Sequence, residues 1–163
     1  MIDHNQKISP NELFGYIETV ALTYGYTGKA LETITEEAHI AIEGMRHELA
    51  FESVLYYIDG IDILETTPED DLKGIDYRIQ RDDGTIIEID VKQNIKSRNR
   101  SIEKQRKYEA ASGRYDPKTK LILWSGFDHS DFQNKSPWRP TQAAVARIAP
   151  SISELLHAIP RNN

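Results

Sequence analysis

Apolar residues recur at helical spacing in two stretches of the N-terminal part of this 163-residue chain. The first stretch opens at Ser9, which has a capping-box partner in Glu12 and a proline, Pro10, at the first helical position. We expect this helix to run to about Tyr24. The second stretch keeps the three- and four-residue spacing from about Thr35 to Ile58, which predicts a long amphipathic helix.

Shorter apolar runs with the composition of strands follow. Ile61–Leu64 is predicted to be the first strand, and Leu121–Trp124 is an apolar run of the buried-strand type. Between them, Gly74–Gln80 and Thr85–Val91 flank a polar Asp-Gly turn, which is the strongest short-range signal of a β-hairpin. Thr66–Asp71 is predicted to be a turn or loop.

Two further helices are predicted after the hairpin. A basic segment from about Asn99 to Ser112 is predicted to be a helix that Gly113 ends. Ser151-Ile152-Ser153-Glu154 has the pattern of a capping box and predicts a last, short helix. The order helix, three strands, helix, strand indicates an α/β fold, and residues 1–163 are long enough to form a single domain without metal or disulfide support.

Composition narrows the class of protein. The chain contains no cysteine, so nothing in it indicates an oxidising compartment or a thiolate site. No apolar stretch approaches the length of a membrane span, and the N-terminus lacks a basic region followed by an apolar one. We therefore expect a cytoplasmic protein without a membrane partner.

The net charge of −6 is unevenly distributed. Residues 1–91 hold 6 Lys and Arg against 20 Asp and Glu, whereas residues 92–120 hold 10 against 3. A basic segment that directly follows a candidate active strand is expected to contact phosphates. The alternative interpretation is a solvated helix face, which is what charge runs usually are.

Charged residues of the predicted hairpin are candidates for a reactive site. Strand side chains alternate between two faces, so Glu88, Asp90 and Lys92 share one face while the apolar residues between them take the other. Asp76 and Asp90, brought together on neighbouring strands, repel each other, and a divalent cation removes that penalty. The pattern indicates a metal-and-lysine site for phosphodiester chemistry. The alternative is the solvated face of an edge hairpin with cross-strand ion pairs.

This pattern resembles the PD-(D/E)XK nuclease superfamily, the restriction-endonuclease-like group, in which an aspartate at a strand end is followed by Asp/Glu-x-Lys on the next strand. Asp76 matches the first aspartate, although Ile75 stands where the family often has proline, and Asp90 with Lys92 matches the second motif. The resemblance covers about residues 42–124. It implies a restriction-endonuclease-like core (helix, three strands, helix, strand) with extra N- and C-terminal helices.

A glutamate on the preceding helix often completes the site of this superfamily. Glu48 follows Gly44 by four positions and precedes Leu55 by seven, which is similar to the opening helix of archaeal Holliday-junction resolvases. The resemblance therefore implies Glu48 as the helix carboxylate, with Glu52, one turn further on the same face, in reserve. His47 has a loose likeness to a histidine of exonuclease-like branches, and we interpret it as an ordinary residue of an amphipathic helix.

The resemblance implies a metal-dependent deoxyribonuclease, an endonuclease, that hydrolyses phosphodiester bonds. The implied ligands of Mg²⁺ (or Mn²⁺) are Asp76, Asp90 and Glu48. Lys92 is expected to orient the attacking water and to stabilise negative charge on the phosphate. Glu88 is a further candidate ligand, but we favour an ion pair between Glu88 and Arg78 across the hairpin.

The partner implied by this function is nucleic acid, expected to be DNA. The expected phosphate contacts are Lys96, Arg98, Arg100, Lys104, Arg106 and Lys107. Gln105 and Tyr108 resemble the Gln-x-x-Tyr segment of exonuclease-like branches and are secondary candidates. Either terminal helix is a candidate for a homodimer interface.

Other functions stay open at this point. A nuclease fold that has lost cutting would bind DNA or protein without cleavage, although the intact Asp, Asp and Lys argue against it. An interaction protein, such as an immunity or assembly factor, would use the acidic N-terminal half as its contact surface. A different metal-dependent hydrolase acting on nucleotides is least favoured, because the chain has no phosphate-cradling glycine loop.

The C-terminal third carries weaker signals. Asp128–Asp131 contains residues that can bind a metal, but without supporting spacing we interpret it as a polar loop. Pro137–Pro140 is expected to pin a loop to the core rather than to place Trp138 against DNA.

Overall fold

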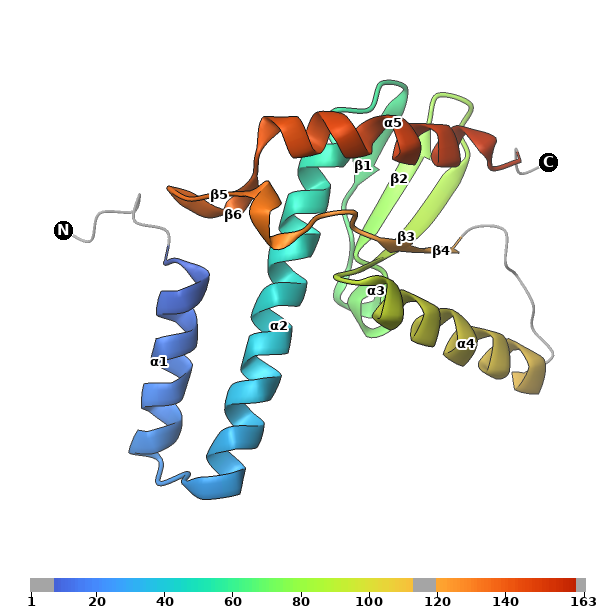
Figure 1. Cartoon of the computed structure of the whole chain (residues 1–163). Helices are drawn as coiled ribbons and strands as arrows, with labels where there is room; N and C mark the ends of the chain where they lie inside the picture. The colour runs from blue at the N-terminus through green and yellow to red at the C-terminus, as the bar shows by residue number, and fades with distance from the viewer. Residues whose placement is uncertain (1–7, 113–119, 161–163) are drawn as a thin grey trace.

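This computed structural model describes residues 8–112 and 120–160. Within them the chain forms five α-helices, a mixed sheet of four strands and a small two-stranded sheet, which confirms the predicted α/β class (Figure 1). Gly113, predicted to end the basic helix, lies outside the described residues. None of the described helices combines the length and the apolar character that crossing a membrane requires.

The first two helices form a hairpin that stands away from the sheet (Figure 1). Helix α1 covers Pro10–Thr23, and the predicted capping box is present, since the Glu12 N–H donates to Ser9 Oγ at 3.2 Å. Helix α2 covers Gly28–Leu55 and therefore begins earlier than predicted. Its first turns pack against α1 rather than against the sheet. The predicted start was wrong because the pattern marks only the part of α2 that faces the core.

The sheet has the strand order β1-β2-β3-β4. Strands β1 (Ile61–Leu64), β2 (Tyr77–Arg81) and β3 (Ile86–Lys92) are antiparallel neighbours, whereas β4 (Lys120–Trp124) runs parallel to β3. The Asp-Gly turn joins β2 to β3 as predicted, with Gly84 at φ +82°. The hairpin and its register therefore follow from local sequence.

A short helix, α3 (Pro68–Leu72), lies where a turn or loop was predicted. Thr67 caps it in a capping box with Asp70, and Pro68 occupies the first helical position. Asp70 is buried, and its carboxylate also accepts a hydrogen bond from Arg78 Nη2 at 2.7 Å, which offsets the cost of burying the charge. This contact joins α3 to β2, so the segment that leads into the hairpin is held in place.

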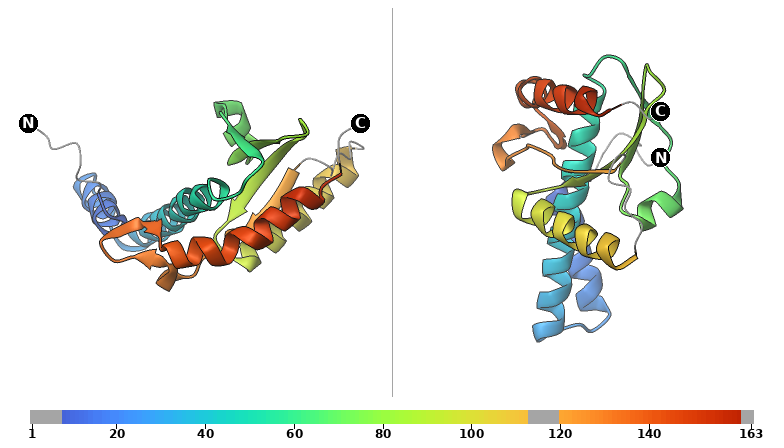
Figure 2. Two further views of the ribbon diagram at one scale, coloured as in Figure 1. Left: turned by 90° about the horizontal axis from the view of Figure 1, so that it is seen from above. Right: turned by 90° about the vertical axis from the view of Figure 1, so that its right-hand side faces the viewer.

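The basic helix α4 covers Ile95–Ser112 and begins before the predicted Asn99, because Asn94 Oδ1 accepts from the Ser97 N–H at 2.8 Å and caps it. Helix α5 covers Gln142–Ala158 and is capped by Thr141. The helices α4 and α5 lie on opposite sides of β4 (Figures 1 and 2).

Helix α5 also corrects the prediction that the last helix begins at Ser151. Pro150 lies inside it, and a proline in a helix interior costs about 3 kcal/mol. The helix continues because its apolar face is buried, and each buried aliphatic side chain stabilises by about 1.5–3 kcal/mol. The residues of that face are Val145, Ile148, Ala149, Ile152 and Leu156.

Between β4 and α5 lie a 3₁₀ turn, η1 (His129–Asp131), and two short strands, β5 (Phe132–Gln133) and β6 (Ser136–Pro140). Arg46 of α2 holds this β5–β6 hairpin. Its Nε donates to Pro137 O at 2.6 Å, and its guanidinium lies 3.8 Å from the centroid of the Phe132 ring. The hairpin is thus pinned to α2, as predicted for the Pro137–Pro140 segment.

The core forms where α2 and α5 cover one face of the sheet. The buried residues at its centre, each at most 1% exposed, are Ala50, Phe51, Val54, Leu55, Ile79, Ile87, Ile89 and Leu156. Because α2 and α5 pack on this face, the opposite face of β3 is left to Glu88, Asp90 and Lys92.

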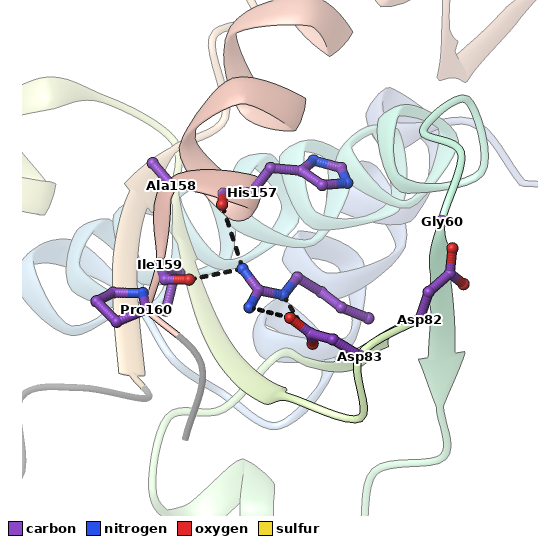
Figure 3. Close-up of a pocket in the computed structure, with 8 residues that line it drawn as sticks. Gly60, Asp82, Asp83, His157, Ala158, Ile159 and Pro160 are labelled. Atoms are coloured by element: carbon purple, nitrogen blue, oxygen red, sulfur yellow. Dashed lines mark hydrogen bonds and ion pairs between the residues drawn. The ribbon is translucent and has the colours of Figure 1, made fainter. Parts of the chain in front are cut away.

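The C-terminal end of α5 is joined to the β2–β3 turn by Arg81 (Figure 3). This buried guanidinium donates to the carbonyl oxygens of Leu156, His157 and Ile159 at 3.0, 3.4 and 2.7 Å. It also pairs with Asp83, with Nη2 2.7 Å from Oδ2. The pocket that these residues line, about 490 Å³ in volume, lies beside the turn and contains none of the predicted site residues.

Candidate active site

The structure places Asp76 directly before β2, against the middle of β3. Its backbone N–H donates to Ile89 O at 2.9 Å, and its carboxylate Oδ2 accepts from the Val91 N–H at 2.6 Å. The Asp76 side chain is therefore held next to the Asp90-Val91-Lys92 segment. This is the neighbourhood that the sequence predicted.

Asp90 and Lys92 lie on the same face of β3. Ile87 and Ile89 are buried on the other face, as the alternation predicts. Asp90 is only 5% exposed, and Lys92 Nζ lies 2.6 Å from its Oδ1. The geometry of this contact is not that of a hydrogen bond. The positive charge of Lys92 therefore offsets the cost of burying the negatively charged Asp90 Oδ1.

Glu48 of α2 reaches the same place from the neighbouring helix. The pKa of the Glu48 carboxyl is raised to about 7, chiefly by burial and also by the charges of Asp76 and Asp90, while the charge of Lys92 opposes the rise. The Tyr77 hydroxyl donates to Glu48 O at 2.7 Å, which fixes this turn of α2 against β2. The four predicted catalytic residues are thus close enough to act on one another electrostatically.

The carboxylates of this cluster fit a hard divalent cation. Burial and the charge of Asp90 raise the pKa of Asp76 as well, although the Val91 N–H opposes the rise. This mutual repulsion is what a bound Mg²⁺ or Mn²⁺ relieves, and both ions prefer oxygen ligands. In the described part of the chain, no three acidic, histidine or cysteine side chains already converge as ligands.

Gly74 lies beside Asp90 and Lys120. A Cβ on Gly74 would lie 3.8 Å from Asp90 Oδ2 and 3.9 Å from Lys120 Nζ, and the φ of +66° disfavours any larger residue. Within the described residues Asp90 Oδ2 makes no hydrogen bond, so it is a potential ligand.

Two charged residues of this neighbourhood were not predicted. The charge of Asp71, on α3, raises the pKa of both Glu48 and Asp76. Lys120 of β4 donates to Lys73 O at 2.6 Å and lies near Asp90 across Gly74. No sequence motif marks either residue, because both approach the site only through the packing of α3 and β4.

The secondary candidates for the site lie on three different elements: β3, α2 and α4. Glu88 pairs with Arg78 across the hairpin, with Nη2 3.2 Å from Oε1, which confirms the favoured interpretation. Glu52 is half-buried one turn beyond Glu48. On α4, Gln105 is half-buried and Tyr108 is 73% exposed.

His47 belongs to the core rather than to the site. Its Nδ1 lies 2.7 Å from Ser125 Oγ, and its ring makes an edge contact with Phe132 at a centroid distance of 5.5 Å. Burial lowers the pKa of this imidazole, which favours the neutral form. The prediction that His47 is an ordinary helix residue rather than a catalytic one agrees with this position.

The expected phosphate contacts lie along α4. Arg98 is half-buried because its Nε donates to Ile122 O at 3.2 Å, which attaches α4 to β4. The other five are exposed: Lys96, Arg100, Lys104, Arg106 and Lys107. Helix α4, which carries these residues, begins three residues after Lys92, at one end of the sheet (Figure 1).

The raised pKa of Glu48 leads to a stability prediction. In the unfolded chain this carboxyl loses its proton near 4.5, whereas in the folded protein it does so near 7, so stability falls as pH rises between these values. Glu48→Gln removes the free-energy cost of ionising this side chain in the folded protein. Because the carboxyl is only half-buried and partly screened, we expect a gain of about 1–2 kcal/mol at pH 8 without metal.

Urea unfolding of both proteins in EDTA at pH 8 and pH 4.5 measures this gain. Near pH 4.5 the difference should vanish. Glu37→Gln, an exposed substitution on the same helix, is the matched control and should change nothing. Equal or lower stability of Glu48→Gln at pH 8 would show that Glu48 is not repelled by its neighbours.

Comparison of the chain with known protein families, curated proteins and solved structures finds no match. The function must therefore be argued from this cluster and its surroundings. The predicted cytoplasmic location and homodimer stay predictions.

Proposed function

We propose that the protein is a metal-dependent nuclease that hydrolyses phosphodiester bonds, with DNA as its substrate. The observation that carries this proposal is the geometry around β3. The Asp76 carboxylate accepts from the Val91 N–H at 2.6 Å, and the flanking side chains of Asp90 and Lys92 lie 2.6 Å apart. Glu48 lies near enough for these charges to act on its carboxyl. Three carboxylates and a lysine beside a basic helix suit the binding and cleavage of a phosphodiester.

The order of elements supports a relationship with the PD-(D/E)XK superfamily. The chain runs α2, β1, β2, β3, α4, β4, with α3 inserted between β1 and β2. Asp76 precedes β2, Asp90 and Lys92 lie on β3, and Glu48 lies on the preceding helix. This is the arrangement that the resemblance implies for a restriction-endonuclease-like core.

Asp76, Asp90 and Glu48 are the residues that would hold Mg²⁺ or Mn²⁺. When bound, such an ion polarises the scissile phosphate and lowers the pKa of a water molecule. The Val91 N–H orients the Asp76 carboxylate, and Asp90 orients the Lys92 ammonium. Lys92 then stabilises negative charge on the phosphate and positions the attacking water.

The exposed lysines of α4 would bind the phosphates on either side of the scissile bond. Replacing Lys104 and Lys107 by glutamine should weaken DNA binding and reduce the slope of log K against log salt by about two, one for each charge. Fluorescence anisotropy at several salt concentrations measures this slope. Lys29→Gln, an exposed lysine on the α1–α2 hairpin, is the control. An unchanged slope would mean that α4 is only a solvated face.

Metal-dependent cleavage tests the proposed function directly. Wild type and Asp90→Ala are incubated with single-stranded, duplex and branched DNA, and with RNA, in Mg²⁺, Mn²⁺ or EDTA. The proposal requires cleavage by wild type that EDTA and the substitution both remove. Binding without cleavage in either metal would instead identify a catalytically silent nuclease-fold module.

A further inference from the structure

A groove of about 430 Å³ lies between α2 and the β5–β6 hairpin. One wall is α2, and the other is formed by β5, β6 and the start of α5. The lining residues that matter here are Leu49, Glu52, Ser53, Gln133, Trp138 and Arg139. Its surface thus combines an aromatic ring, an aliphatic side chain and several polar groups.

The groove is built on fixed elements. Arg46 holds the β5–β6 hairpin to α2 through Pro137 O and the Phe132 ring. The Trp138 indole N–H donates to Ile8 O, which uses the polar edge of the ring and fixes its orientation. The ring faces therefore offer a rigid flat surface without a polar group left to satisfy.

Glu52 connects the groove to the candidate active site. It lines the groove and lies one turn of α2 beyond Glu48, a rise of about 6 Å. The Tyr77 hydroxyl donates to Glu48 O at 2.7 Å, which holds this part of α2 against β2. If a phosphate of a nucleic-acid strand is bound at Glu48, the neighbouring base of that strand is therefore within reach of the groove.

We propose that this groove binds one unpaired nucleobase of the strand that is cleaved. The inference rests on the proposed function, which it extends to single-stranded or locally unpaired nucleic acid. The segment of Trp138 was expected only to pin the loop to the core; we now also assign this ring a contact with nucleic acid. Trp138 supplies a stacking surface, and stacking on an aromatic side chain does not require a particular base. Leu49, 45% exposed, supplies an apolar contact, and the exposed Arg139 is placed to pair with a backbone phosphate.

The polar groups of the groove favour some bases over others. Gln133 Nε2 already donates to Pro140 O at 2.9 Å, so the amide offers its carbonyl oxygen to a ligand. Glu52 is an acceptor as a carboxylate. An acceptor-rich edge favours bases with an exocyclic amino group, which are adenine, cytosine and guanine, over thymine.

Binding measured without catalysis tests this inference. In EDTA, labelled oligo(dC), oligo(dT) and a duplex are titrated with wild type, Trp138→Ala and Trp138→Phe. Trp138→Ala should weaken oligo(dC) binding about tenfold and leave duplex binding unchanged. Trp138→Phe should keep most of the affinity but lose the quenching of tryptophan fluorescence that the base produces, with Trp124 as the internal reference.

Tyr24→Ala is the matched control, because it removes an exposed aromatic ring at the distant tip of the α1–α2 hairpin. Circular dichroism reports whether Trp138→Ala still folds, and Trp138→Phe keeps the test valid if it does not. Glu52→Gln should reduce the preference for oligo(dC) over oligo(dT).

The outcomes separate this inference from the proposed function. Single-strand binding that is insensitive to both Trp138 substitutions overturns the base-binding groove, even if DNA is cleaved. Binding that depends on Trp138, without cleavage in Mg²⁺ or Mn²⁺, supports the groove and contradicts the nuclease. Equal affinity for oligo(dC) and oligo(dT) overturns the proposed base preference.

Discussion

Asp90→Asn and Lys92→Met are each expected to lower the rate of cleavage by about 10²–10³-fold. Asp90 is the most buried carboxylate of the cluster, and its Oδ2 lies near Gly74. Lys92 is the cation that lies against Asp90. Single-turnover cleavage in Mg²⁺ gives the rate of each variant.

Because Asp90 and Lys92 contact each other, their substitutions should not be additive. The double variant Asp90→Asn/Lys92→Met should be no slower than Asp90→Asn alone. Glu88→Gln is the matched control, since Glu88 lies on the same face of β3 but pairs with Arg78. We expect it to retain a rate close to that of wild type. A wild-type rate in either single variant would remove that residue from the chemistry.

Arg81→Met is expected to lower the free energy of unfolding by about 3–5 kcal/mol. The substitution removes a buried guanidinium that donates to three carbonyl oxygens at the end of α5 and pairs with Asp83. A hydrogen bond from a charged donor contributes about 1.5–3 kcal/mol, and a buried acceptor left without a partner destabilises the fold. Urea denaturation followed by circular dichroism measures the difference.

Arg147→Met is the control for Arg81. Arg147 also pairs with an aspartate, Asp131, but its side chain is 54% exposed, so its loss should cost less than about 1 kcal/mol.

The effect of Arg81 should also depend on pH. Thr85 and Arg81 hold the pKa of Asp83 well below its ordinary value of 3.8. The stabilisation from Asp83 is present above pH 3.8 and is lost at more acidic pH. The difference in free energy of unfolding between wild type and Arg81→Met should therefore become smaller at acidic pH. A constant difference would contradict this role of the pair.

The hairpin and the residues of the candidate site could be predicted because they depend on local pattern. Alternation along β3 assigns Asp90 and Lys92 to one face, and the Asp-Gly turn sets the register that pairs Arg78 with Glu88. Glu48 was proposed from the resemblance of its spacing on α2 to the opening helix of a known family. These signals lie within a few residues of the features that they predict.

Other features depend on packing between segments that are distant in sequence. The five residues of α3 are too few for a periodic pattern, and the Arg78 contact of Asp70 helps to hold them. Lys120 approaches the site only because β4 pairs with β3, which no motif near Lys120 indicates. The capping-box pattern at Ser151 suggested a start for the last helix, but burial of the apolar face of α5 continues the helix through Pro150.

The parallel pairing of β3 and β4 has an electrostatic consequence. Two parallel neighbours cannot be joined by a tight turn, so the chain must leave the end of β3 and return to the start of β4 through a crossover connection. Helix α4 forms the described part of that connection and begins at Ile95, three residues after Lys92. The N-terminal end of a helix macrodipole carries about half a positive elementary charge. The topology of the sheet therefore places a fixed positive pole beside Lys92, in addition to the charges of the side chains.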